Sequence, residues 1–340
     1  MKLSDFDYVL PKELIAQEPL KERSKCRLMV LDRTKYTIEH KTFEDIVSYI
    51  RPEDLLVLND TKVIPARLFG KRSTGGKVEI FLIEKKEPTC EALVRPSGRI
   101  KEGEKITLES GIEAEVLGWG EVGRFVRFDR PIDEVLEFGH VPLPPYINRL
   151  DVPEDKSSYQ TVYADREGAT ASPTAGLHFT RELLVRIASC GARIEYVTLH
   201  TNYGTFAPVK TEEVENHKMH KESFELSVKT VDEIMKTKET GGKVFAVGTT
   251  STRVLESCST LLKTYNLQLT AKSGDTDIFI YPGFKFKVVD HLITNFHLPK
   301  STLMLLVSAF AGREFIFEAY RKAVEEKYRF FSYGDTMLIL

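Results

Sequence analysis

The stretch that decides the fold is KVFAVGTTSTRVLESCSTLL, residues 243–262, in which a short apolar run leads through four hydroxyl residues into a helical pattern. The same succession of helix and strand continues on both sides of it. We expect helices over 181–191, 231–242, 251–262, 301–312 and 313–328, and strands over 193–200, 243–248 and 276–282. This alternation predicts an α/β fold, with a mixed or parallel sheet flanked by helices.

The amino-terminal third has a different character. Residues 26–33 and 54–60 read as buried strands separated by a helical stretch, 41–50. Six short alternating runs then follow, separated by turn residues, over 63–70, 77–84, 90–96, 104–109, 112–118 and 124–129. They predict a small antiparallel β-barrel. Because the first strands are expected to join the later sheet, we predict a discontinuous α/β domain (1–61 plus 155–340) and an inserted barrel domain (62–154).

Composition limits the class of protein. The 340 residues carry 48 Lys+Arg against 50 Asp+Glu, a net charge of -2, which excludes a uniformly basic nucleic-acid coat. The charge is uneven, however: residues 62–101 have a balance of +6 and residues 102–138 a balance of -6. A polarised barrel could present one basic face to phosphates, although ordinary solvated strand edges give the same pattern.

The four cysteines form no CxxC pair, which argues against a disulfide framework and a thiolate zinc site and favours a reducing cytoplasm. The longest apolar stretch, 303–311, is too short to span a bilayer, so we expect no membrane association. Gly118, Gly120 and Gly123 satisfy GxGxxG, but another strand follows them, and the dinucleotide fingerprint must open a helix. We interpret them as a glycine-rich hairpin.

Three clusters combine polar groups with loop positions. The first is 247–253, where hydroxyls at a strand end and helix start suit a polar or anionic ligand, or serve only as a helix cap. The second is 168–180, small and hydroxyl residues around His178, with Thr180 as the expected cap of the next helix. The third is 277–299, in which aromatic residues lie beside Asn295 and His297, and Ser301 is expected to cap the following helix.

Histidines also gather near the expected strand ends. His217 and His220, spaced i,i+3 and close to Glu222, could begin a zinc site. HExxH is absent and no cysteine joins the group, so we expect no metal. Acid/base work and a structural role both remain open for these histidines.

Taken in order, these segments resemble the S-adenosylmethionine:tRNA ribosyltransferase-isomerase family of queuosine biosynthesis. The matching segments include LNDTKVIPARLFG, ALVRPSGRIKEG, GHVPLPPYI, GATASPTAGLHFT, VGTTSTRVLES, TDIFIYPGFKF and DHLITNFHLPKSTLMLLVSAFAG. The resemblance runs over the whole chain. One departure is Thr201-Asn202-Tyr203 before Gly204-Thr205-Phe206, where smaller residues including glycine are expected.

The resemblance implies an α/β domain with an inserted barrel, acting on tRNA that carries 7-aminomethyl-7-deazaguanine at the wobble position. Such an enzyme transfers and isomerises the ribosyl part of S-adenosylmethionine to form epoxyqueuosine, and adenine and methionine leave. S-adenosylmethionine is then a substrate, and no cofactor is expected. We expect a cytoplasmic monomer.

This chemistry needs a base for the ribose 5' carbon beside the sulfonium and a proton donor for departing adenine. The candidate catalytic residues are His178, His200, His220, Glu222, Asp290 and His297. The candidate substrate-binding residues are Asp60, Arg67, Thr174, Gly176, Thr249, Thr250, Ser251, Arg253 and Asn295, with Asp60 for ribose hydroxyls or the incoming amine and Arg253 or 249–251 for the methionine carboxylate. The candidate tRNA-binding residues are Lys71, Arg72, Arg95 and Arg99.

Two alternatives stay open at the level of sequence. One is a tRNA-binding protein without catalysis, which uses the basic barrel strands. The other is a methyltransferase that uses the same donor, although the chain lacks a glycine-rich nucleotide loop that feeds a helix.

Overall fold

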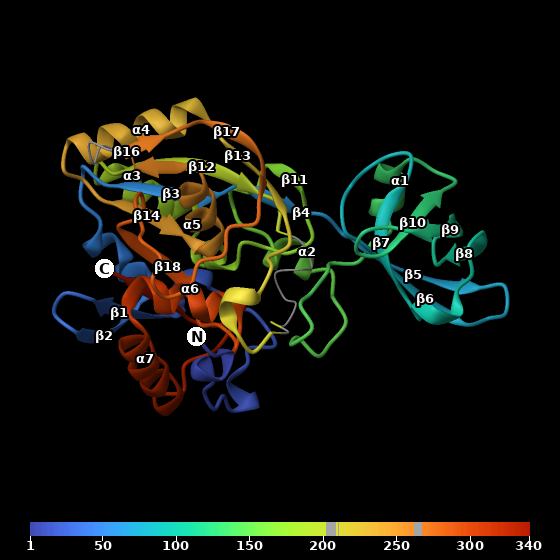
Figure 1. Ribbon diagram of the computed structural model, residues 1–340, viewed down its shortest axis with the longest axis horizontal. Helices are drawn as coiled ribbons and strands as arrows, with labels where there is room; N and C mark the ends of the chain where they lie inside the picture. The colour runs from blue at the N-terminus through green and yellow to red at the C-terminus, as the bar shows by residue number, and fades with distance from the viewer. Residues whose placement is uncertain (202–208, 210, 262–266) are drawn as a thin grey trace.

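The computed structural model describes residues 1–201, 209, 211–261 and 267–340. Its largest element is a nine-stranded sheet in the order β17-β13-β12-β3-β14-β18-β19-β1-β2 (Figure 1). The strands are β1 (Arg27–Asp32), β2 (Thr37–Thr42), β3 (Leu55–Asn59), β12 (Arg193–Leu199), β13 (Glu222–Leu226), β14 (Val244–Val247), β17 (Lys272–Thr276), β18 (His291–Asn295) and β19 (Thr336–Ile339). The central strands β12, β3, β14 and β18 are parallel, and antiparallel pairs lie on both sides of them. The expected mixed sheet is confirmed.

Alternation along the strands gives the sheet two apolar faces. Leu55 and Val57 of β3 point into one core, and Leu56 and Leu58 into the other. The first face is covered by α4 (Val228–Glu239), α5 (Gly248–Ser257), α6 (Thr302–Ala311) and α7 (Arg313–Glu325). The second is covered by α3 (Arg181–Ser189) and the 3-10 segments η4 (Phe43–Tyr49) and η6 (Thr174–His178). Helices therefore flank the sheet on both faces.

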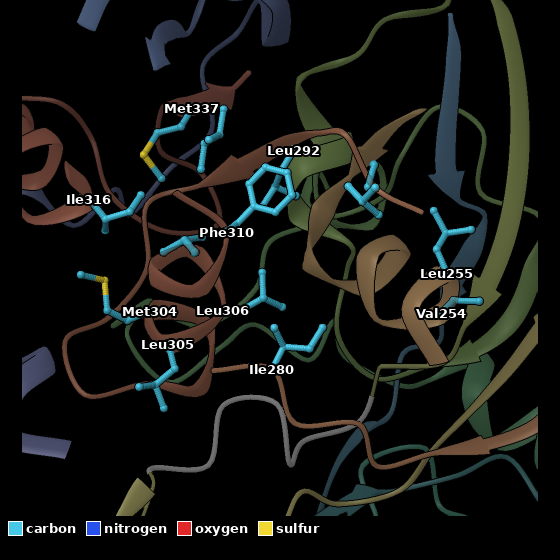
Figure 2. Packing of buried hydrophobic residues seen from close by; sticks show 14 of the residues in the cluster. Val254, Leu255, Ile280, Leu292, Met304, Leu305, Leu306, Phe310, Ile316 and Met337 are labelled. Atoms are coloured by element: carbon cyan, nitrogen blue, oxygen red, sulfur yellow. The ribbon is translucent and has the colours of Figure 1, made fainter. Parts of the chain in front are cut away.

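The first core holds the helices against the sheet. Figure 2 shows Leu255 of α5 on one side of this core and Leu306 and Phe310 of α6 near Leu292 of β18. Each of these side chains is almost completely buried. Burying a leucine or phenylalanine contributes roughly 1.5 to 3 kcal/mol. Packing of this kind fixes the first turn of α5 relative to the end of β18.

The closed barrel is formed by six strands in the order β10-β7-β6-β5-β8-β9. They are β5 (Arg67–Arg72), β6 (Lys77–Leu82), β7 (Cys90–Arg95), β8 (Glu104–Leu108), β9 (Glu113–Trp119) and β10 (Arg124–Phe128). Each expected run contributes one antiparallel strand, so the barrel is confirmed. α1 (Ile132–Glu137) packs its apolar residues against the barrel core. The GxGxxG residues lie at the β9-β10 turn, as the hairpin interpretation requires.

Short elements join the barrel to the sheet. β4 (Thr61–Val63) pairs with β11 (Arg166–Ala169), and α2 (Asp155–Ser158) lies in the segment that returns from the barrel. His140 and Arg67 exchange backbone hydrogen bonds of 2.8 and 3.3 Å where the chain enters and leaves the barrel. Figure 1 shows the barrel standing to one side of the sheet. A further pair, β15 (Ser259–Leu261) with β16 (Leu267–Leu269), lies after α5.

Three expectations about elements were wrong or incomplete. The strand expected over 276–282 does not form: Thr276 ends β17, and the chain after it packs Ile280 into the core without pairing. Helix α5 begins at Gly248, three residues early, because Gly248 adopts a φ of +92° that turns the chain directly from strand into helix. β2, β18 and β19 were not assigned from the sequence.

The caps at two other helices are as expected. Thr180 accepts a hydrogen bond from Leu183 N at 3.1 Å, and Ser301 accepts one from Met304 N at 3.1 Å. Both contacts satisfy an otherwise unpaired amide in the first turn. They fix where α3 and α6 begin.

Candidate active site

The parallel strands bring four polar segments to one edge of the sheet. Asp60 follows β3, His200 follows β12, Gly248 follows β14 and Asn295 ends β18. Since all four strands point the same way, their carboxyl ends share that edge. Ligands of open α/β sheets bind at this edge.

A cavity of about 310 Å³ lies at the ends of β14 and β18. Residues 172–175 and the first turn of α5 form part of its wall, and residues 294–301 form another part. Tyr146 and Phe331 add aromatic surface. The cavity thus combines an apolar lining with polar groups in a few places, as small-molecule sites do.

Several hydroxyls in this cavity lack a protein partner. Ser172, Thr201 and Thr250 are at most 8% exposed, and their side-chain oxygens have no hydrogen-bond partner among the described residues. Buried hydroxyls are normally paired, because an unpaired one costs roughly 1 to 3 kcal/mol. The cavity is therefore shaped for a ligand that supplies polar partners.

His297 also lines the cavity. Its Nε2 lies 2.8 Å from Thr294 Oγ1, and its backbone N–H donates to Tyr320 Oη at 2.9 Å. Burial lowers the pKa of His297 to about 3. The imidazole is consequently neutral at physiological pH, and the same low pKa makes it a weak base in this structure.

Asn295 connects the cavity to groups behind it. Its Nδ2 donates to Phe331 O at 3.1 Å and to His178 Nε2 at 3.0 Å, while its Oδ1 accepts from Thr174 Oγ1 at 3.0 Å. The carbonyl partner fixes which end of the amide is nitrogen. The amide therefore orients the Thr174 hydroxyl at the cavity wall.

His178 lies behind this wall and outside the lining of the cavity. Its Nε2 accepts from Asn295, so Nδ1 carries the proton and faces Cys26 Sγ at 3.1 Å. Burial, together with the cationic Arg23 and Arg329, lowers the pKa of His178 to about 3. The geometry supports a positioning role for His178 and does not place it next to a ligand.

His200 and Asp60 lie at the adjacent carboxyl ends of β12 and β3. His200 Nδ1 is 2.8 Å from Thr61 Oγ1, and burial lowers the pKa of the ring. Asp60 Oδ1 accepts from Thr198 Oγ1 at 2.7 Å, and burial raises the pKa of the carboxyl. Both are half-buried near a second cavity, which His200 lines.

The four predicted residues of α5 do not all face the cavity. Thr249 and Thr250 line the cavity, whereas Ser251 turns back and donates to Val247 O at 2.9 Å. Arg253 forms a buried ion pair with Glu222. Its Nε and Nη2 have no partner among the described residues, but the side chain does not line the cavity.

Two predicted catalytic residues lie elsewhere. Asp290 precedes β18, at the opposite edge of the sheet, and accepts from Lys238 Nζ at 2.6 Å and Val244 N at 2.8 Å. His220 is exposed before β13 and lines neither cavity. The geometry gives no support for proton transfer by either group.

Gly176 and Arg67 have structural surroundings. A Cβ on Gly176 would lie 2.0 Å from Tyr163 Oη, so only glycine fits there. Arg67 begins β5 in the barrel, where Nη2 donates to Leu143 O at 3.3 Å and Nε lies 3.2 Å from Glu79. Neither lines the cavity.

The predicted tRNA-binding residues share one end of the barrel, at the carboxyl ends of the like-directed strands β5 and β7. Lys71, Arg95 and Arg99 are exposed. Arg72 is held by Glu104 through contacts of 2.5 and 3.1 Å. This end lies five residues along β5 from the junction with the sheet, about 17 Å at 3.4 Å per residue.

Sequence reasoning singled out some of the cavity wall and missed the rest. Thr201, Thr294, Ser332 and Tyr146 were not proposed as site residues, although all four line the cavity. A usable signal was a hydroxyl residue just after or at the end of a strand, as in Thr201 and Thr294. The unusual segment 202–206 lies outside the described residues.

Two features are absent from the described residues. No three or more histidine, cysteine, aspartate or glutamate side chains come close enough together there to hold a metal ion. Within those same ranges, no helix has the length and apolar composition needed to cross a bilayer.

The fold and cavity define an α/β protein with a partly polar cavity at the carboxyl edge of its sheet and a separate β-barrel. Residues 3–339 match the family described as "Queuosine biosynthesis protein", and the chain belongs to that family. It is 54% identical to an S-adenosylmethionine:tRNA ribosyltransferase-isomerase from a Sulfurihydrogenibium species and 52% identical to one from Thermosipho africanus, over 100% of each chain.

A solved structure is also similar over the full length. It is the crystal structure of S-adenosylmethionine tRNA ribosyltransferase from Thermotoga maritima. The TM-score is 0.57 and the identity 40%, over 99% of this chain and 100% of that chain. The similarity therefore extends across both the sheet and the barrel.

Proposed function

We propose that this protein transfers and isomerises the ribosyl part of S-adenosylmethionine onto 7-aminomethyl-7-deazaguanine in tRNA. The products are epoxyqueuosine in tRNA, adenine and methionine. The observation that carries the proposal is the identity of 54% over the whole chain to a relative named for this activity. A cavity with unpaired buried hydroxyls supplies a place for the donor.

We propose one orientation for the donor in the cavity. The amino end of α5, with the hydroxyls of Thr249 and Thr250, suits the methionine carboxylate, because unpaired amides and the helix dipole favour an anion there. Tyr146 and Phe331 offer apolar surface for the adenine. The ribose then lies between them, near Asn295 and His297.

His297 is the candidate base for the ribose 5' carbon. Of the histidines predicted from the sequence, it is the one in the cavity wall. Its hydrogen bond with Thr294 fixes the ring, and burial keeps it neutral. The adjacent sulfonium makes the 5' carbon more acidic, but a base with a pKa of about 3 takes a proton poorly, so the proposal requires that the bound substrates raise the pKa of His297 towards neutrality.

We also propose the division into a discontinuous domain, 1–61 plus 155–340, and an inserted domain, 62–154. The position of all six barrel strands between β4 and β11 in the chain supports it. The protein would act as a cytoplasmic monomer, and the proposal calls for no cofactor, because S-adenosylmethionine is a substrate.

The experiment is an assay of adenine release by the full-length protein. We expect adenine only when S-adenosylmethionine and tRNA containing the aminomethyl base are both present. Asn295→Ala should reduce turnover at least tenfold. Binding of tRNA without adenine release would instead indicate a non-catalytic binding protein, and methyl transfer to the tRNA would indicate a methyltransferase.

A further inference from the structure

The amino-terminal segment is fastened to the loop that carries His297. Tyr8 Oη donates to the backbone oxygen of His297 at 2.5 Å. Lys300 N donates to Phe6 O at 3.0 Å, and Lys300 Nζ lies 2.6 Å from the carboxylate of Asp7. In Figure 1 the amino terminus lies beside α6, the helix that follows this loop. The segment therefore holds the loop at three points.

The same segment is itself anchored in the fold. Phe6 is buried in the apolar core of the sheet and helices. Leu3 lines the cavity proposed for the donor, and its N–H donates to Glu212 O at 2.7 Å. The ring of Tyr8 packs edge-on against Tyr320 of α7, with the ring centroids 5.0 Å apart. The Tyr8 hydroxyl is thus presented from a fixed position and not from a frayed terminus.

Two tyrosines hold the backbone of His297, one on each side of its Cα atom. Tyr320 Oη accepts from the N–H of His297 at 2.9 Å, and Tyr8 Oη donates to its C=O. The side chain is held separately, because Nε2 lies 2.8 Å from Thr294 Oγ1. The peptide units before and after His297 define its two soft backbone dihedrals, so fixing both units fixes where the side chain leaves the backbone. The two tyrosines therefore set how the imidazole lies in the cavity wall.

We propose that Tyr8 is a positioning residue for His297: its hydroxyl holds the backbone so that the imidazole faces the ribose of the bound donor. The inference rests on the proposed function, in which His297 acts on the ribose 5' carbon. Tyr8 does not itself line the cavity, so it acts through His297 and not on the donor. Burial raises the pKa of Tyr8, and its hydroxyl consequently stays protonated and donates at physiological pH. Loss of this contact should slow the chemical step and spare donor binding, because a misplaced reacting group affects mainly the transition state.

The test is Tyr8→Phe, which removes the hydroxyl and keeps the ring. We expect kcat for adenine release to fall about fivefold, the effect of losing one hydrogen bond, while KM and the calorimetric Kd for S-adenosylmethionine stay unchanged. Hydrogen exchange of the backbone amides over 297–302 should become faster, because the loop loses one attachment. The control is Tyr36→Phe, which removes the hydroxyl of a tyrosine that is 74% exposed between β1 and β2. The control should leave kcat, Kd and exchange as they are.

An unchanged kcat in Tyr8→Phe would overturn the inference, whatever the exchange rates. So would a loss of donor affinity as large as the loss of kcat/KM, since that result describes a general loosening of the cavity and not the misplacement of one group. The unmodified protein is assayed first. If it releases no adenine, the proposed function fails and this inference with it, whereas normal release that Tyr8→Phe does not slow refutes the inference alone.

Discussion

At the scale of single residues, His178 makes the stability of the fold depend on pH. Burial lowers its pKa to about 3, against about 6.5 in an unfolded chain. Between these values the unfolded state holds a proton that the folded state lacks, so stability is complete above pH 6.5 and falls as the pH decreases. His297 carries a similar shift.

The variant His178→Gln removes one of these two groups. Between pH 7 and pH 5, the free energy of unfolding of the unmodified protein should fall by about 2 kcal/mol more than that of the variant. The histidine contributes about 1.36 kcal/mol to this fall for each pH unit below 6.5. Urea unfolding at both pH values measures this difference. An identical loss in both proteins would show that His178 is not held neutral in the fold.

Gly176 tests the packing beside the cavity. In Gly176→Ala the new Cβ meets Tyr163 Oη at 2.0 Å and Thr161 Cγ2 at 2.9 Å, and both neighbours are buried or half-buried. We expect a loss of about 1 to 3 kcal/mol, typical of overpacking. The control is Gly98→Ala, where the Cβ meets nothing within 4 Å. A thermal midpoint for Gly176→Ala equal to that of the control would contradict the packing described.

At the scale of elements, we expect a hydroxyl in the first turn of α5 to contribute to ligand binding and not to stability. Thr250→Val keeps the shape but removes a buried hydroxyl that has no partner among the described residues. We expect unchanged or higher stability and a five- to tenfold loss of affinity for S-adenosylmethionine, measured by calorimetry.

Thr252→Val is the matched control in the same helix. Its hydroxyl donates to Gly248 O at 3.1 Å and does not line the cavity. This variant should lower stability by up to about 1 kcal/mol and leave donor affinity intact. If Thr250→Val bound the donor normally, α5 would not form part of the donor site.

Most helices and strands were predictable because the spacing of their apolar residues, or the cap before them, is typical of a helix or a strand. The barrel strands alternate regularly, β3 is a short continuous apolar run, and α3 and α6 begin at caps visible in the sequence. The run DIFIY alternates as a strand does but finds no partner, since pairing depends on which chain lies alongside. β18 was missed because its residues, HLITN, are buried by neighbouring strands and show little periodicity.

The site was harder to predict than the fold. Thr249 was identified by the end of its strand, and Asn295 and His297 by their place just before the expected start of a helix. Sequence could not tell that Asp290 precedes its strand and lies at the opposite edge, since β18 itself was not recognised. Nor could it show that Ser251 bonds back to its own helix.

At the scale of the whole molecule, the barrel end with Lys71 and Arg99 is the candidate phosphate-binding surface. Lys71→Glu with Arg99→Glu should weaken tRNA binding at low salt and reduce the salt dependence by about two phosphate contacts. Arg72 is best left intact, because reversing it would oppose Glu104. An unchanged affinity and salt slope, from binding titrations at several salt concentrations, would move the RNA surface to the sheet side of the molecule.

The central claim is that S-adenosylmethionine gives its ribosyl carbons, and not its methyl group, to tRNA. It is tested most directly by incubating the full-length protein with aminomethyl-containing tRNA and donor labelled either in the ribose or in the methyl group. We predict that ribose label enters the wobble nucleoside while methyl label leaves with methionine. Methyl label in the tRNA, or no label from either donor, would contradict the account.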